Sequence, residues 1–165
     1  MTGQFTDLLA ANAGHAAEFP LAGHDGVARA GVAVVTCMDP RVDPLSMLRL
    51  RAGDAAILRN PGARVTDHVL AGIVLAVHLL GVERVLVVAH TRCAVAGTDE
   101  ETLRRRVAGV SGQDASRASL GAVPDQQATL RADVARVRTH PLVPEKVAVG
   151  GFRYDVDTGP LSQFV

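Results

Sequence analysis

The sequence predicts an α/β fold with a mostly parallel central sheet of about four strands, flanked by helices and followed by a C-terminal antiparallel extension. Short runs rich in valine and other apolar residues, typical of buried strands, occupy residues 31–36, 55–59 and 84–89. Between the second and third runs, apolar residues recur at helical spacing from 67 to 80. A strand, a helix and a second strand in this order form a crossover, and crossovers connect parallel strands.

The first half of the chain contains two further predicted helices. Residues 6–19 have a weak amphipathic pattern, and we assign residues 1–30 to an N-terminal helical arm that packs on the body or on a partner subunit. Asp43 followed by Pro44 is typical of a helix start, so we expect a short helix from there to about residue 50. Because the chain has only 165 residues, we expect a single domain.

The second half of the chain supplies the rest of the sheet and its cover. A segment that resembles a capping box begins a helix at 98–107, and a proline begins another at 124–139. Residues 146–155 are predicted to form the last parallel strand. After a turn, residues 161–165 fold back antiparallel to it.

Composition and charge argue against several classes of protein. Basic and acidic residues balance at 17 each, so no net charge favours nucleic acid or a membrane surface as a partner. Aromatic residues make up 3% of the chain and tryptophan is absent, which leaves no stacking platform for single-stranded nucleic acid. The longest apolar run, residues 69–82, is shorter than a membrane span, and residues 1–7 lack the pattern of a signal peptide. We therefore expect a cytoplasmic protein that binds neither nucleic acid nor membranes.

Two short motifs carry the candidate chemistry. Cys37 follows the first predicted strand, and His90 and Cys93 follow the third. Ligands of open α/β sheets bind at the carboxyl ends of the strands, so the three side chains meet if these two strands are neighbours. Two thiolates and one imidazole suit Zn²⁺, and three protein ligands leave a coordination position for water or a carboxylate.

These motifs resemble the signature of the β-class carbonic anhydrases, which combines C-x-D-x-R with H-x-x-C. The sequence matches that signature at five positions: Cys37, Asp39, Arg41, His90 and Cys93. Two further segments are similar to family motifs, namely Arg-Asn-Pro-Gly at 59–62 and the final strand and turn at 151–159. The resemblance covers most of the chain from residue 31 onwards.

The resemblance implies an enzyme that catalyses the reversible hydration of carbon dioxide to bicarbonate and a proton. It implies that Cys37, His90 and Cys93 hold Zn²⁺, which lowers the pKa of a bound water from about 15.7 to about 7. It also implies that Asp39, held by Arg41 through a charge-assisted bond, orients the resulting hydroxide. In a closed form of the site, Asp39 would instead take the fourth zinc position.

The resemblance further implies a homodimer or a tetramer of dimers. Gly62 permits a close approach of the backbone to a ligand, and we place it at the substrate. The chain departs from the usual family pattern at Pro40, Ala63 and Ala94, each of which adds a methyl group or a ring near the metal.

Two alternative functions stay open at this point. One is a hydrolase of carbonyl sulfide or carbon disulfide on the same scaffold, since both are linear molecules like carbon dioxide. The other is a non-catalytic zinc-binding protein in which Asp39 closes the site permanently. A thiol redox protein is disfavoured, because Cys37 and Cys93 lack the C-x-x-C spacing.

Overall fold

Strands and helices alternate through most of the chain. The structure is a computed structural model that describes residues 3–165. Its elements, in chain order, are α1 (Thr6–Ala17), β1 (Val32–Cys37), α2 (Pro44–Met47), β2 (Ala55–Asn60), the 3₁₀ turn η1 (Pro61–Ala63), α3 (Asp67–Leu79), β3 (Arg84–His90), α4 (Glu100–Ser111), α5 (Gln126–Arg138), β4 (Ala148–Tyr154) and β5 (Leu161–Gln163).

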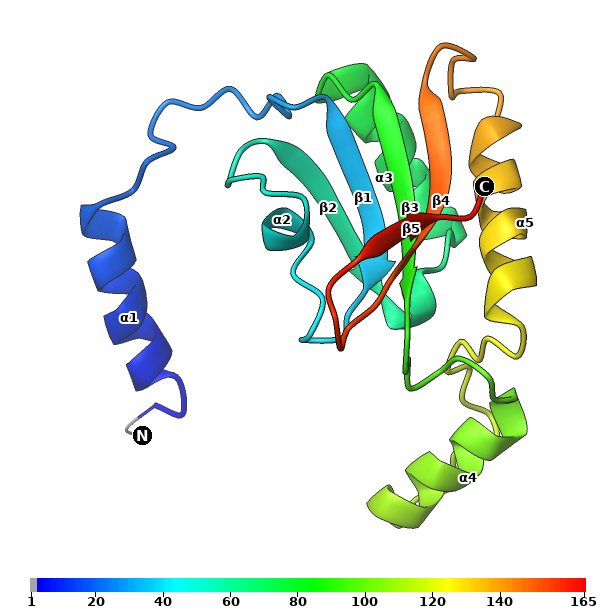
Figure 1. The fold of residues 1–165 in the computed structure, drawn as a ribbon. Helices are drawn as coiled ribbons and strands as arrows, with labels where there is room; N and C mark the ends of the chain where they lie inside the picture. Colours follow the sequence, from blue (N-terminus) through cyan, green and yellow to red (C-terminus); the bar gives the residue numbers. More distant parts are fainter. Residues whose placement is uncertain (1–2) are drawn as a thin grey trace.

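The strands form a sheet in the order β2-β1-β3-β4-β5 (Figure 1). The first four strands run parallel to one another, and β5 pairs antiparallel with β4. The predicted fold class, a mostly parallel sheet with a C-terminal antiparallel extension, is therefore confirmed.

β1 lies in the middle of the parallel strands, and its position allows the predicted site to assemble. It pairs with β2 on one edge and β3 on the other, and all six of its residues are buried. Burial on both faces explains its continuous apolar run at 32–35. Because Thr36 pairs with Val88 of β3, the last residues of the two strands, Cys37 and His90, lie at the same edge of the sheet.

Helices cover the two faces of the sheet unequally. α3 and α5 pack on one face, where their apolar side chains join those of β1 and β3 in the larger hydrophobic core (Figure 1). On the other face, Met47 of α2 packs on a smaller cluster built around Val32, Val34 and Val88. The larger core holds the sheet in place, whereas the second face keeps many of its apolar side chains only partly buried.

Three helices end at different residues than the sequence predicts. α1 ends at Ala17, two residues before the predicted end. α2 ends earlier, at Met47, because Arg49 adopts a positive φ of 53° that a right-handed helix does not allow. α4 runs longer than predicted, to Ser111, and Gly112 ends it in the left-handed conformation with a φ of 68°. The ends of α2 and α4 are set by backbone conformation at the helix terminus, and the spacing of apolar residues does not indicate that conformation.

The strand bounds also differ slightly from the prediction. β1 ends at Cys37 and β3 at His90, so these two side chains leave from the strands themselves and not from the loops that follow. The last two strands are shorter than predicted, at Ala148–Tyr154 and Leu161–Gln163. Because Cys37 and His90 are themselves strand residues, the hydrogen bonds of β1 and β3 fix the direction of these two candidate ligands.

The helix of the N-terminal arm stands apart from the sheet (Figure 1). α1 has no buried residue, although it carries apolar side chains. Leu8 and Leu9 are 62% and 69% exposed, and Phe5 just before the helix is 64% exposed. The sequence thus forms the predicted helix, but no other segment of residues 3–165 covers its apolar side chains.

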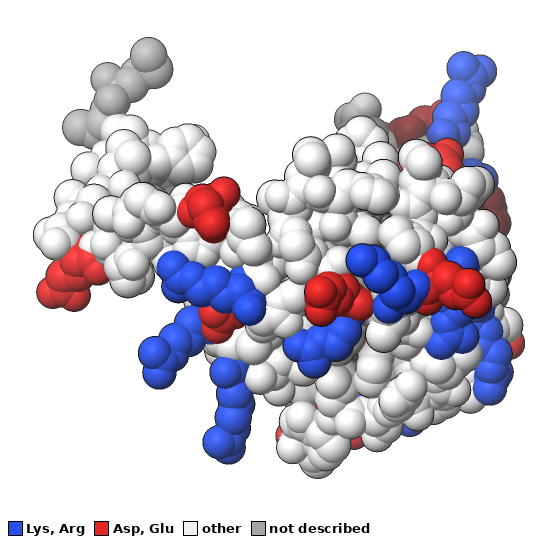
Figure 2. Space-filling model, turned by 90° about the horizontal axis from the view of Figure 1, so that it is seen from above, with Lys and Arg blue, Asp and Glu red and all other residues white. Residues whose placement is uncertain are grey.

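Charged side chains are mixed on the surface. Figure 2, which views the molecule from above, shows basic and acidic side chains side by side in a band across the body. Within residues 3–165, every helix is too short or too polar to span a bilayer.

Candidate metal centre

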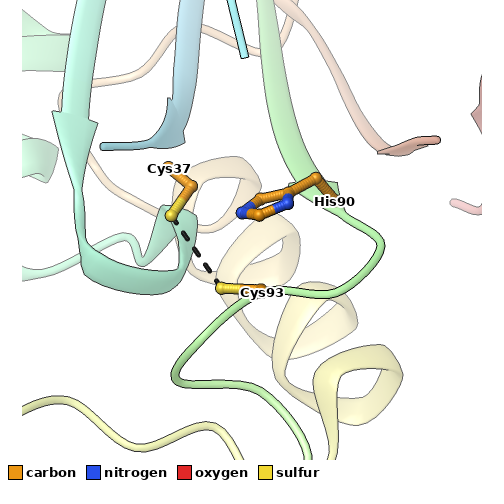
Figure 3. Close-up of side chains that lie close together, drawn as sticks. All are labelled: Cys37, His90 and Cys93. Atoms are coloured by element: carbon orange, nitrogen blue, oxygen red, sulfur yellow. Dashed lines mark hydrogen bonds between the residues drawn. The ribbon is translucent and has the colours of Figure 1, made fainter. Parts of the chain in front are cut away.

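Cys37, His90 and Cys93 converge where β1 and β3 end. Figure 3 shows the three side chains pointing toward one another, with Cys37 from β1, His90 from β3 and Cys93 from the loop after β3. One sulfur or nitrogen atom of each lies within 4.8 Å of the others. All three residues are buried, with His90 only 1% exposed. The structure therefore brings together the three residues that the sequence singles out as metal ligands.

The spacing of the two sulfur atoms suits a tetrahedral zinc site. The Sγ atoms of Cys37 and Cys93 lie 3.9 Å apart and both cysteines are free. Two thiolates at the usual zinc–sulfur distance of about 2.3 Å, in tetrahedral geometry, stand about 3.8 Å apart. The pair is thus spaced as it would be around one zinc ion.

The hydrogen bonds of His90 leave one ring nitrogen without a partner and aimed at the cysteines. Its Nδ1 lies 2.8 Å from the carbonyl oxygen of Thr91, and since a carbonyl only accepts, Nδ1 must carry the proton. Nε2 then has a free lone pair, is buried, and makes no hydrogen bond within residues 3–165. A buried nitrogen of this kind is costly unless something else binds it, and a metal ion does so.

Hydrogen bonds prepare one of the two cysteines, Cys37, to act as a thiolate. The pKa of Cys37 lies far below its ordinary value, chiefly because the thiol of Cys93 donates to its sulfur; the nearby ring of His90 and the N–H groups of Asp39 and Gly62 lower it further and outweigh burial. The pKa of Cys93 is raised, because its proton is held by Cys37 and because the thiol is buried. The two sulfurs thus share one proton, and a divalent cation between them would take its place.

Asp39 lies beside the three ligands and is bound to Arg41. The guanidinium donates from Nε to Oδ1 at 2.9 Å and from Nη2 to Oδ2 at 2.7 Å. The Arg41 guanidinium holds the pKa of this carboxyl well below its usual range, so Asp39 is ionised. Its Oδ2 is 3.9 Å from Nε2 of His90. In this structure Asp39 therefore stays outside the group of three and next to it.

Two residues outside the predicted set of ligands support the site through its backbone. Arg59 donates from Nε to the carbonyl oxygen of Cys37 at 2.9 Å and from Nη2 to that of Asp39 at 2.7 Å. Gln126, the first residue of α5, donates to the carbonyl oxygen of His90 at 3.0 Å. For Arg59, the sequence signal is its place at the end of a strand, just before the Asn-Pro-Gly turn. For Gln126, the local sequence holds no signal.

An apolar pocket of about 370 Å³ opens beside the two cysteines. Leu103 and Val107 of α4, together with Leu120, form part of its wall. These side chains come from a segment that the sequence did not connect with the site. Pro40 and Ala94, two of the departures from the family pattern, also line the pocket. The pocket therefore has metal ligands on one side and aliphatic side chains on the other.

Gly62 is required by the turn that it forms. Its φ is 76°, and a Cβ atom there would lie 3.0 Å from methyl groups of both Val95 and Val123. Its N–H faces the sulfur of Cys37, whereas its neighbour Pro61 lines the apolar pocket. The structure thus places Gly62 behind a metal ligand.

Comparison with known proteins agrees with this geometry. The sequence matches the carbonic anhydrase family over residues 32–161. It is 30% identical over 132 residues to β-carbonic anhydrase 1 of Mycobacterium tuberculosis, and the match covers 80% of each chain. It is 29% identical over 150 residues to a carbon disulfide hydrolase of Acidithiobacillus thiooxidans, covering 78% of this chain and 74% of that one. The solved structure of a carbonic anhydrase from Streptococcus mutans has a TM-score of 0.87 at 31% identity and covers 100% of this chain and 99% of that chain. On these matches, the chain belongs to the β-class carbonic anhydrase family.

Proposed function

We propose that this protein is a zinc-dependent carbonate dehydratase, which interconverts carbon dioxide and water with bicarbonate and a proton. Cys37, His90 and Cys93 hold the metal, and Asp39 and Arg41 act on the reacting water. The observation that carries the proposal is the ionised carboxylate of Asp39 beside the three converging donor atoms, with Oδ2 3.9 Å from Nε2 of His90. A chain of the carbonic anhydrase family with this arrangement has the parts that hydration requires.

The residues of this chain divide the work between them. Zn²⁺, when bound, supplies the Lewis acidity that makes water a nucleophile near neutral pH. The carboxylate of Asp39 accepts a hydrogen bond from the attacking water and so aims a lone pair of that water at the carbon atom of carbon dioxide. Arg41 keeps Asp39 ionised and fixed, and it is itself anchored by a bond of 3.1 Å from its Nη2 to the carbonyl oxygen of Arg92.

The surroundings of the site favour an apolar gas as substrate. Carbon dioxide carries no charge, and Leu103, Val107 and Leu120 offer it an aliphatic wall beside the cysteines. Gly62 acts by keeping its N–H on the sulfur of Cys37 and by leaving room at the turn, and through this turn it shapes the substrate side of the metal.

Two measurements on the purified protein test the proposal. Elemental analysis should find about one zinc ion per chain, as expected for one set of three protein ligands. Stopped-flow assays with a pH indicator should record carbon dioxide hydration, faster near pH 9 than near pH 7, because water must lose a proton before it attacks. Stoichiometric zinc without hydration at either pH would refute the proposal and favour the non-catalytic zinc protein, in which Asp39 closes the site.

The apolar pocket also favours a second candidate function, the hydrolysis of carbonyl sulfide or carbon disulfide. The pocket is lined mainly by aliphatic side chains, which suit a sulfur-containing gas at least as well as carbon dioxide. The relative from Acidithiobacillus thiooxidans is a carbon disulfide hydrolase. Release of hydrogen sulfide from either gas, at a kcat/KM above that for carbon dioxide, would make this the main activity.

We further propose that the chain forms a homodimer, or a tetramer of dimers, and that the arm of residues 1–30 packs on a partner subunit. The exposed side chains of Leu8 and Leu9 support this, since isolated apolar helices without a covered face are not stable in water. Light scattering on the full chain should give at least a dimer, and a Leu8→Asp/Leu9→Asp variant should dissociate. Val110 of α4, which is 92% exposed, supplies the control, because Val110→Asp should leave the molar mass of the assembly unchanged. A monomeric wild-type chain would refute this part.

A further inference from the structure

We propose that Arg59 is a positioning residue for the hydration reaction. Its guanidinium spans the carbonyl oxygens of Cys37 and Asp39 and so sets the distance between a metal ligand and the carboxylate that acts on water. The inference rests on the proposed function, and it adds a residue that touches neither the metal nor the substrate.

The geometry of the contact is specific. Arg59 is the next-to-last residue of β2, and in the register of the sheet it pairs with Thr36, the residue before Cys37. From there its Nε reaches the carbonyl oxygen of Cys37 at 2.9 Å, and its Nη2 reaches that of Asp39 at 2.7 Å. One planar group therefore holds two carbonyl oxygens, one on each side of Met38.

Between Cys37 and the buried Val42, the loop that carries Asp39 is held mainly by hydrogen bonds. Met38 is 63% exposed, and Pro40 and Arg41 are exposed as well, so side-chain packing contributes little to the shape of the loop. Besides Arg59, β2 contributes one backbone bond, from the N–H of Met38 to the carbonyl oxygen of Asn60 at 3.0 Å. The conformation of this loop thus depends on hydrogen bonds, and Arg59 donates two of them.

The pair of Asp39 and Arg41 does not by itself fix the carboxylate relative to the metal. These two side chains sit on the same loop, two residues apart, and can move together. Arg41 is tied to the loop of Cys93 by its bond to the carbonyl oxygen of Arg92, and Arg59 ties the backbone of Asp39 to the end of β2. The carboxylate is thereby held between two anchors, the loop after β3 through Arg41 and the end of β2 through Arg59.

The shape of the guanidinium matters as much as its charge. A planar fork can donate two bonds in fixed directions, whereas the lysine ammonium is a compact charge on a flexible stem. Lysine at position 59 would keep the positive charge near the loop and hold one carbonyl oxygen at a time.

The test compares Arg59→Ala with Arg84→Ala as a matched control. Arg84 also donates to a backbone carbonyl, from Nη2 to Ala30 at 2.7 Å, but it begins β3 at the end opposite His90. For each variant, bound zinc is measured by elemental analysis, zinc affinity by competition with a chelator, and kcat and KM by stopped flow per zinc-loaded chain. We expect Arg59→Ala to lower kcat per bound zinc by about 100-fold with little change in KM, the effect typical of a catalytic group displaced by about 1 Å.

Zinc affinity and chemical rescue give readouts that a general loss of stability would not imitate. We expect the zinc affinity of Arg59→Ala to fall by about tenfold, as for other residues that support metal ligands indirectly. Guanidinium chloride at low millimolar concentration, well below denaturing levels, should restore part of its kcat and leave Arg84→Ala unchanged. Arg59→Lys should fold, bind zinc and remain impaired in kcat.

Clear outcomes would overturn the inference. The inference is wrong if kcat per bound zinc for Arg59→Ala lies within about twofold of the Arg84→Ala control. This holds even if zinc affinity falls, because Arg59 would then support Cys37 alone. Wild-type kcat in Arg59→Lys would also contradict it and remains measurable if the alanine variant fails to fold. A wild-type chain that binds zinc without hydrating carbon dioxide would instead refute the proposed function itself.

Discussion

Replacing Asp39 with asparagine should separate catalysis from metal binding. Cys37, His90 and Cys93 supply the metal-binding atoms, and Asp39 lies outside that group, so Asp39→Asn should keep its zinc. The amide is neutral, and one of its two positions now carries N–H groups that face the guanidinium of Arg41. The asparagine variant therefore loses the negative charge of the group that accepts a hydrogen bond from water. It also loses one of the two hydrogen bonds from Arg41 that orient the side chain.

The expected loss of activity is large, and the expected loss of stability is small. A positioned group that accepts a proton or hydrogen bond in the transition state contributes about 10²- to 10⁴-fold in rate. That corresponds to about 2.7 to 5.4 kcal/mol of activation free energy. The side chain of Arg41 is 37% exposed, so its pair with Asp39 adds little to folding and the melting temperature should change by no more than about 4 °C.

The assay measures kcat per bound zinc at alkaline pH, together with zinc content and melting temperature. Asp43→Asn is the matched control. Asp43 is in the same segment and caps α2 by accepting from the N–H groups of Leu45 and Ser46, a role that asparagine fills equally well. The control should retain wild-type activity. If Asp39→Asn keeps more than about a tenth of wild-type kcat, or if it loses its zinc, the role given to Asp39 is wrong.

Three further predictions concern the metal, the turn and the pocket. Cys37→Ser should lose zinc, because a serine hydroxyl does not ionise at neutral pH, and near-stoichiometric zinc in the purified variant would contradict the ligand assignment. Gly62→Ala should lower the free energy of unfolding in urea by about 2 kcal/mol, since alanine at a φ of 76° is strained and its Cβ would contact two valine methyl groups at 3.0 Å; an unchanged midpoint would refute this. Glu100 accepts hydrogen bonds from the N–H groups of Leu120 and Ala122, which hold its pKa below the ordinary value. Its stabilising effect is therefore present above the unfolded pKa of about 4.3 and lost as pH falls through the lower folded value. Thermal melts should show Glu100→Gln less stable than wild type near neutral pH and the difference shrinking below about pH 4; a constant difference would count against the contact.

Part of the fold could be predicted because its signals are local. The buried run at 32–35 reads as a strand because every residue is apolar, and the crossover between residues 55 and 90 follows from apolar spacing alone. Asp43 caps α2, as its position before Pro44 predicts. The ends of helices were less predictable, since the positive φ of Arg49 that ends α2 has no signature in an arginine.

The surroundings of the site were less predictable than its ligands. The C-x-D-x-R and H-x-x-C motifs name the residues that converge, but the pocket wall comes from Leu103, Val107 and Leu120. Their contact with the cysteines depends on the path of α4 and the segment after it, where Glu100 holds the backbone at Leu120. Local sequence patterns do not report contacts of this kind.

The sequence by itself determined which atoms this protein offers to a metal and at which strand ends they sit, because strand formation and ligand type are properties of neighbouring residues. Only the tertiary structure decided that β1 and β3 are adjacent and that Asp39 bonds to Arg41 outside the group of ligands. It also decided that Arg59 holds the backbone from Cys37 to Asp39. The physical reason is that strand order and hydrogen bonds between distant segments follow from how the whole chain buries its apolar faces, which no short stretch of sequence encodes.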